Sequence, residues 1–178
     1  KYIRILDNNL FSYSGWKECL LELKQLNICI KFENFDVRLL TEEKAELLST
    51  IKVDGNYIFA LDHPNEIPIF EQKIPILKKY FHSWMPKFDI LVGYNTTIKD
   101  DINRVYLCIK NKFLPYIMRH ENCYISPYKD FYTDLSAYCN QPQFIKKMSF
   151  EEFLFRRHTS KNAKNRINFS LTLWTENQ

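Results

Sequence analysis

Residues 52–73, KVDGNYIFALDHPNEIPIFEQK, decide how this sequence is interpreted. We expect a β-hairpin over about 56–73, with Glu71-Gln72-Lys73 on its second strand. Side chains two apart on a strand share a face, so Glu71 and Lys73 would point to the same side. Asp54, from the preceding strand, would add a second carboxylate. Two carboxylates beside an ammonium group predict an oxygen-rich site for Mg²⁺ or Mn²⁺, which assists phosphoester cleavage.

The register of this hairpin is open in the sequence. In one register Glu71 faces Ile58, and Asp54 lies four residues further along, roughly 13 Å away at about 3.3 Å per residue. In the other, a loop centred on His63 places Asp54 opposite Gln72 and close to the metal site. Three residues of this kind also occur by chance on solvated hairpins, so a plain surface hairpin is the alternative.

The segments around this stretch carry further motifs in a fixed order. KVD at 52–54 and EQK at 71–73 are followed by YFHSW at 80–84 and PKFDILVG at 86–93. These resemble the EVD, ELK, WWxQS and PxIxVG motifs of the Dom-three-Z (DXO) family of RNA decapping exoribonucleases. IKFE at 30–33 is similar to that family's GYKFE, and LTLWTE at 171–176 to its LFSWEP. The resemblance covers about a third of the chain.

The resemblance implies a fold and a reaction. The fold is α/β, a mixed β-sheet flanked by helices with a restriction-endonuclease-like PD-(D/E)XK core, in one domain over 1–178 that lacks an N-terminal portion of the family. The implied activity is RNA 5′-end processing: removal of non-canonical caps, pyrophosphate release or 5′→3′ trimming.

The resemblance also implies the site residues and their roles. Glu33, Asp54 and Glu71 would bind the divalent metal. Lys73 would orient or deprotonate the attacking water, and His82 would contact the water or the metal shell. The implied partners are RNA 5′ ends and a nuclear 5′→3′ exoribonuclease or another nuclear protein.

Departures from the family pattern favour a second interpretation. Lys52 stands where the family has a glutamate, and a cation there repels a metal ion. His82 replaces a glutamine, and Tyr94-Asn95 stand where the family has an arginine. The alternative is an inactive family member that shelters RNA 5′ ends or serves as a nuclear scaffold. An unrelated restriction-like DNA nuclease would keep the three acidic and basic residues but would not explain the resemblance over 77–93.

Composition limits the class of protein. Hydrophobic residues make up 46% of the 178 residues, which predicts a globular chain with a real core. The net charge of +4 permits nucleic-acid binding. No apolar run is long enough to span a membrane and no signal peptide is visible. The five cysteines include no CxxC pair, which predicts reduced thiols in a nuclear or cytoplasmic protein.

A basic run near the C-terminal end is a candidate RNA-binding surface. Its cationic residues are Arg156, Arg157, Lys161, Lys164 and Arg166, with no acid among them. It could track RNA phosphates, or it could be a solvated loop. The aromatic residues of 113–145 predict core packing, with stacking platforms for unpaired bases as the alternative.

The other elements follow from apolar periodicity and capping residues. Strands are expected over 1–6, 28–33, 88–92 and 167–174. Helices are expected over 14–27, from Thr41, over 75–85 and from the Ser149 capping box, and 102–110 is either strand or helix.

Overall fold

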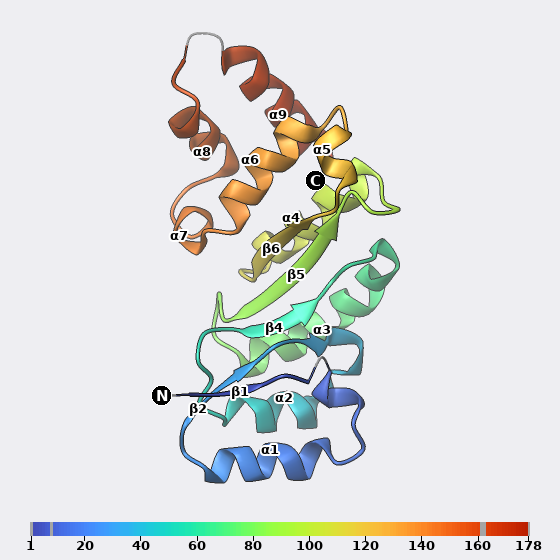
Figure 1. The fold of residues 1–178 in the computed structure, drawn as a ribbon, viewed down its shortest axis with the longest axis vertical. Coiled ribbons are helices and arrows are strands. Elements are labelled where there is room, and N and C mark those ends of the chain that lie inside the picture. Colours follow the sequence, from blue (N-terminus) through green and yellow to red (C-terminus); the bar gives the residue numbers. More distant parts are fainter. Residues whose placement is uncertain (1, 8, 161–162, 178) are drawn as a thin grey trace. The chain divides into compact units, whose positions relative to one another are not determined.

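The computed structural model describes residues 2–7, 9–160 and 163–177. The chain divides into two compact units. The first unit comprises Lys1–Leu61 and Asn65–Phe88, and the second comprises Asp62–Pro64 and Asp89–Gln178. The chain contains parallel strands flanked by helices, which confirms the mixed α/β class (Figure 1). Within the described residues, no helix is both long enough and apolar enough to cross a membrane.

The first unit places helices beside two groups of strands (Figure 1). Helix α2 packs against α1 and α3. The elements are β1 (Tyr2–Ile5), η1 (Leu10–Ser12), α1 (Trp16–Gln25), β2 (Cys29–Phe32), β3 (Phe35–Asp36), η2 (Val37–Leu39), α2 (Glu42–Ser49), β4 (Tyr57–Ala60), α3 (Ile67–Tyr80) and the start of β5 (Pro86–Val92).

The second unit continues β5 and is otherwise mainly helical (Figure 1). Helix α6 packs against β6 and against α5, α7, α8 and α9. The elements that follow β5 are α4 (Ile98–Lys110), β6 (Leu114–Arg119), α5 (Asn122–Ile125), α6 (Lys129–Cys139), α7 (Pro142–Ile145), α8 (Phe150–Arg157) and α9 (Lys164–Glu176). The short turn η3 (Pro64–Glu66) lies at a boundary between the units, because Pro64 belongs to the second unit and Asn65 to the first.

The strands form two sheets. β1 and β2 pair in parallel, with Tyr2 opposite Cys29. The second sheet has the strand order β3-β4-β5-β6, and β3 and β4 are parallel. The outer side of β6 is covered by α6, because the Asn140 side chain accepts from the Ile117 N–H at 2.7 Å and donates to the Ile117 carbonyl at 3.0 Å. This amide satisfies backbone groups that an edge strand would otherwise expose.

The β-hairpin predicted over 56–73 is wrong. Its first half is strand β4, but the second half belongs to helix α3. Phe70 and Leu77 are fully buried, while Ile67 and Ile74 are half-buried. Apolar residues therefore recur every three or four positions, which is the period of a helix that buries one face.

Two prolines conceal this helix in the sequence. Pro68 lies in the first turn, where a missing N–H removes no helical hydrogen bond. Pro75 lies inside the helix and lacks the N–H that would bond the carbonyl four residues earlier. The helix predicted to begin at Pro75 therefore begins at Ile67.

The strand predicted over 167–174 is also wrong, since these residues lie in α9. A strand would bury Ile167 and Phe169 together. Instead Ile167 and Ser170 are buried and Phe169 is 43% exposed. The same sequence places residues 167, 170, 171 and 174 on one helical face, and this face packs inward.

Most other predicted elements are confirmed. Strands are present at β1, β2 and β5, and helices at α1, α2 and α8. Thr41 caps α2 by accepting from the Lys44 N–H, and Ser149 and Glu152 form the predicted capping box of α8. The undecided stretch 102–110 is helical, within α4.

Aromatic side chains form the core of each unit. In the first unit Phe35 stacks on Phe11, with 4.5 Å between ring centroids, and Phe59 stacks on Phe88 at 5.4 Å. In the second unit Phe150 contacts the rings of its neighbours on α6, α8 and α9. The core role predicted for the aromatic residues of 113–145 is confirmed for Phe113, Phe131, Tyr132 and Tyr138.

Candidate functional site

A hollow of about 250 Å³ in the first unit contains one of the predicted site residues, Asp54. The backbone before it is held in extended form, because the Asp54 N–H donates to the Ile30 carbonyl at 2.8 Å. Gly55 then turns the chain with a φ of +95°, which favours glycine. The residues that line this Asp54 hollow are Lys31, Phe32, Asp54, Gly55, Asn56, Ile58 and Lys87.

Two lysines and one aspartate supply the charged side chains of the Asp54 hollow. Lys31 and Lys87 are half-buried, and Asp54 is exposed. Lys52 is also exposed, and its place two residues before Asp54 in an extended segment puts it on the same side. The Lys31 ammonium lies 5.9 Å from the ring centroid of Tyr2, which is 53% exposed. The exposed Tyr2 ring thus lies beside the Lys31 ammonium group.

The other predicted metal ligands, Glu33 and Glu71, do not line this hollow. Glu33 forms an ion pair with Arg4, and the hydrogen bond from Arg4 lowers the pKa of this carboxyl. Glu71 is exposed on α3. Throughout 2–7, 9–160 and 163–177, no group of three or more His, Cys, Asp and Glu side chains is placed to hold a metal ion. The Mg²⁺ or Mn²⁺ site stays a prediction.

The predicted catalytic residues do not share a face in the way a strand would allow. Successive helical residues are about 100° apart around the axis, so Glu71 and Lys73 diverge by about 200° on α3. Burial and then the nearby Lys73 ammonium lower the pKa of Lys44, which places Lys73 beside another cation. His82 is exposed in the turn after α3. The structure does not bring Glu71, Lys73 and His82 together around a common point.

The predicted RNA-binding residues are split between an internal ion cluster and the surface. Asp134, fully buried on α6, accepts hydrogen bonds from Arg157 at 3.0 Å and Arg166 at 2.9 Å, and His158 Nε2 lies 3.0 Å away. Lys164 is exposed, and Lys161 lies outside the described residues. The arginines of this Asp134 cluster attach α8 and α9 to α6.

Arg156 belongs to a different surface. It lines a pocket of about 220 Å³ together with Gln141, Phe144, Phe153 and Arg157. The Arg157 guanidinium lies over the Phe153 ring, 5.8 Å from its centroid. RNA binding by this basic run stays a prediction, with Arg156 and Lys164 its exposed cations among the described residues outside the Asp134 cluster.

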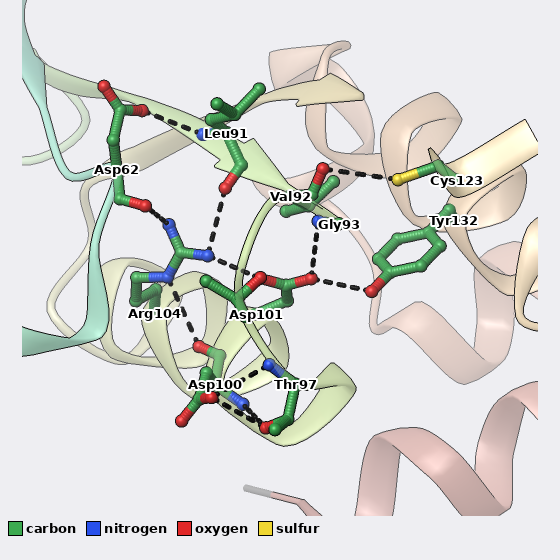
Figure 2. Close-up of polar contacts among 11 residues, drawn as sticks. Asp62, Leu91, Val92, Gly93, Thr97, Asp100, Asp101, Arg104, Cys123 and Tyr132 are labelled. Carbon is green, nitrogen blue, oxygen red and sulfur yellow. Dashed lines mark hydrogen bonds and ion pairs between the residues drawn. The ribbon is translucent and has the colours of Figure 1, made fainter. Parts of the chain in front are cut away.

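Sequence reasoning missed a buried ion pair in the second unit. Arg104 and Asp101 on α4 have no solvent exposure and bond each other (Figure 2). Arg104 also donates to the carbonyls of Asp62 at 2.7 Å and Leu91 at 3.0 Å. The Asp62 carboxylate in turn accepts from the Leu91 N–H at 2.9 Å. This Asp101 network fixes the turn after β4 and the end of β5 against α4.

The Asp101 carboxylate is fully occupied by donors. It accepts from the Gly93 N–H at 2.9 Å and the Tyr132 hydroxyl at 2.6 Å, besides Arg104 (Figure 2). It also accepts from the Thr96 hydroxyl at 2.7 Å. A sequence signal for it exists: Asp101 and Arg104 are three apart on a helix whose start is marked by a Thr97–Asp100 capping box. Their burial is a tertiary property that this spacing alone does not reveal.

Comparisons with known proteins add no relative. No protein-family model matches the chain, and no curated protein or solved structure matches it either.

Proposed function

We propose that this chain binds the phosphorylated 5′ end of RNA at the Asp54 hollow and does not cleave it. The observation that supports the proposal is the lining of this hollow, where Lys31 and Lys87 flank Asp54. Two ammonium groups in a concave site attract a phosphate. The volume of about 250 Å³ suits a phosphate group better than a whole nucleotide.

Charge favours an anion over a metal ion at this site. Two lysines, Lys31 and Lys87, line the hollow beside the single carboxylate Asp54, and Lys52 lies on the same side. A divalent cation would meet one carboxylate and several ammonium groups, whereas hard divalent cations need several oxygen ligands. The exposed Tyr2 ring beside Lys31 offers a surface on which the first base can stack.

Resemblance to the decapping exoribonucleases is the reason for choosing an RNA end as the ligand. The proposal includes a restriction-endonuclease-like core and divergent membership of that family for this chain, and both stay predictions. Metal-dependent decapping, pyrophosphate release and 5′→3′ trimming stay predictions as well. Binding without turnover is preferred because Glu71 lies on helix α3 and does not line the Asp54 hollow.

Fluorescence anisotropy tests the proposal with two short RNAs of one sequence, one with a 5′-triphosphate and one with a 5′-hydroxyl. We expect the triphosphate RNA to bind more tightly. Lys31→Glu and Lys87→Glu should each weaken its binding by about tenfold or more and reduce the salt slope by about one. Lys78→Glu, on the exposed face of α3, makes the same charge change away from the hollow and should leave affinity unchanged.

Asp54→Asn separates anion binding from metal-dependent catalysis. If the lysines hold the phosphate, this change removes a repelling charge and strengthens binding by roughly threefold, the effect of about 0.7 kcal/mol from one charge at about 6 Å in water. If Asp54 holds a metal, binding and any Mn²⁺-dependent release of 5′ products are lost. Turnover that disappears in Glu71→Ala and Lys73→Ala would overturn the proposal in favour of the hydrolase.

A further inference from the structure

A second hollow, of about 300 Å³, lies in the second unit. It is distinct from the Asp54 hollow and takes no part in the proposed function. Its walls come from the loop after β5, the start of α4, the short helix α5 and the start of α6. The lining residues are Gly93, Thr96, Thr97, Ile98, Asn122, Cys123, Ser126, Tyr128 and Tyr132.

We call this second hollow the carboxyl-edge pocket, because it lies at the edge of the sheet where open α/β sheets bind ligands. β5 ends at Val92 and β6 at Arg119, and the His120 N–H donates to the Val92 carbonyl at 3.0 Å. The loops after these two neighbouring strands therefore leave the sheet at the same edge. Ligands of such sheets bind outside the carboxyl ends of the strands.

The floor of the pocket is rigid. Gly93 and Tyr132 line the pocket and also bond the buried Asp101 carboxylate (Figure 2). Thr96, another lining residue, bonds the same carboxylate. The Cys123 thiol donates to the Val92 carbonyl at 3.3 Å. Gly93 has a φ of +74°, and a side chain there would collide with the Cys123 sulfur. A floor held this firmly keeps the pocket in one shape before any ligand arrives.

The lining carries no ionised side chain near neutral pH. Its residue types are Gly, Thr, Ile, Asn, Cys, Ser and Tyr. Burial, followed by the Asp101 charge, raises the pKa of Cys123 to about 11. The same two causes raise the pKa of Tyr132. The hollow is therefore neutral, with hydroxyl and amide groups beside two tyrosine rings.

The start of α4 does not make this an anion site. Asp100 accepts from the Thr97 N–H at 2.9 Å and from the Thr97 hydroxyl at 2.7 Å. The hydroxyl bond is the main cause that lowers the pKa of Asp100, which is therefore a carboxylate at neutral pH. A fixed negative charge at the positive end of the helix dipole offsets the attraction that a phosphate would feel.

We propose that the carboxyl-edge pocket binds a small uncharged ligand that presents hydroxyl or amide groups around a ring. Asn122 and Ser126 supply hydrogen bonds, the Thr96 and Thr97 hydroxyls can still accept them, and Tyr128 and Tyr132 supply apolar contact. A charged ligand would lose its hydration and find no opposite charge in the lining. The volume lies at the small end of ligand pockets, which fits a ring system with a few polar substituents.

Saturation-transfer NMR tests this with probe pairs that differ in charge. The pairs are nicotinamide and nicotinate, cytidine and cytidine 5′-monophosphate, and N-acetylglucosamine and its 6-phosphate. We expect at least one neutral member to bind, with its charged partner weaker by about tenfold or more. Amide shifts of the uniformly ¹⁵N-labelled chain should then change at Gly93 and Asn122 and remain constant at Gly55 in the other unit.

Two tryptophan variants locate the binding. Asn122→Trp fills the pocket and should abolish the signal. Ile125→Trp alters the same short helix at a residue that is 86% exposed and outside the lining, and it should bind as the wild type does. The proposal is overturned if no neutral probe binds at millimolar concentration, if charged partners bind equally well, or if the shifts map elsewhere. The shift map decides even if Asn122→Trp fails to fold.

Discussion

The two units handle charge in opposite ways. In the first unit the ion pairs Lys17–Glu43, Lys79–Glu42 and Arg38–Asp36 lie at the surface, and stacked phenylalanines fill the core. In the second unit two carboxylates, Asp101 and Asp134, are fully buried with cationic partners. Exposed pairs contribute little to stability, whereas a buried charge that loses its partner is costly. The surface pairs of the first unit therefore contribute little to its stability, whereas the buried pairs of the second unit are structural.

Arg104→Met should produce the largest effect. It leaves Asp101 buried without its cation, which costs about 3–5 kcal/mol. Urea unfolding followed by circular dichroism measures the loss. Lys79→Met removes an exposed pair of the first unit and should leave the midpoint unchanged. A loss below about 1 kcal/mol for Arg104→Met would mean that the buried pair stabilises the chain no more than an exposed pair does.

Asp134→Asn should cost less, about 2–3 kcal/mol, because the three groups that it releases are partly exposed and can be hydrated. The damage should be local. Hydrogen exchange in α8 and α9 should accelerate more than exchange in β5 and α4. Asp130→Asn, at the exposed partner of Arg166, is the matched control. Equal protection of α8 and α9 in both variants would show that Asp134 does not hold these helices.

Gly93→Ala and Gly55→Ala compare one glycine of positive φ from each unit. Both have positive φ, so alanine is strained by about 1 kcal/mol at either position. At Gly55 the new methyl group has open space, whereas at Gly93 it meets Cys123. Gly93→Ala should therefore lose about 2–3 kcal/mol. The double variant Gly93→Ala, Cys123→Ala should recover the excess, and no recovery would contradict the collision.

Sequence patterns predict this fold where one interpretation dominates. The apolar run 88–92 predicted strand β5 and the Ser149 capping box predicted α8, and the structure confirms both. α9 satisfies the period of a strand and that of a helix together, and packing of Ile167 and Ser170 decides between them. The prediction for α3 was wrong for another reason: Pro75 is a helix-breaking residue that the surrounding packing tolerates.

The candidate site was harder to predict than the fold. Asp54 lies in a hollow, but its neighbours Lys31 and Lys87 come from strands far apart in sequence, and no local spacing joins them. The proposed link between Asp54 and Glu71 depended on the hairpin, and it lost its geometric basis when 67–80 formed a helix. When a site is built from several elements, one wrongly predicted element therefore misplaces its side chains relative to all the others.

Cys123 should give the smallest effect, and it tests the neutrality of the carboxyl-edge pocket. Its pKa is raised to about 11 in the folded chain, so the folded state disfavours the thiolate. The stability from a neutral thiol is fully present below the ordinary thiol pKa of 9.0 and is lost as pH rises towards about 11. At pH 10 the loss should be on the order of 1 kcal/mol.

Urea unfolding of wild type and Cys123→Ala at pH 8 and pH 10 isolates this contribution, because the titration of all other groups is shared. An equal decline in both proteins would mean that this thiol ionises as freely in the folded chain as in the unfolded one, and the pocket would then hold a charge at alkaline pH.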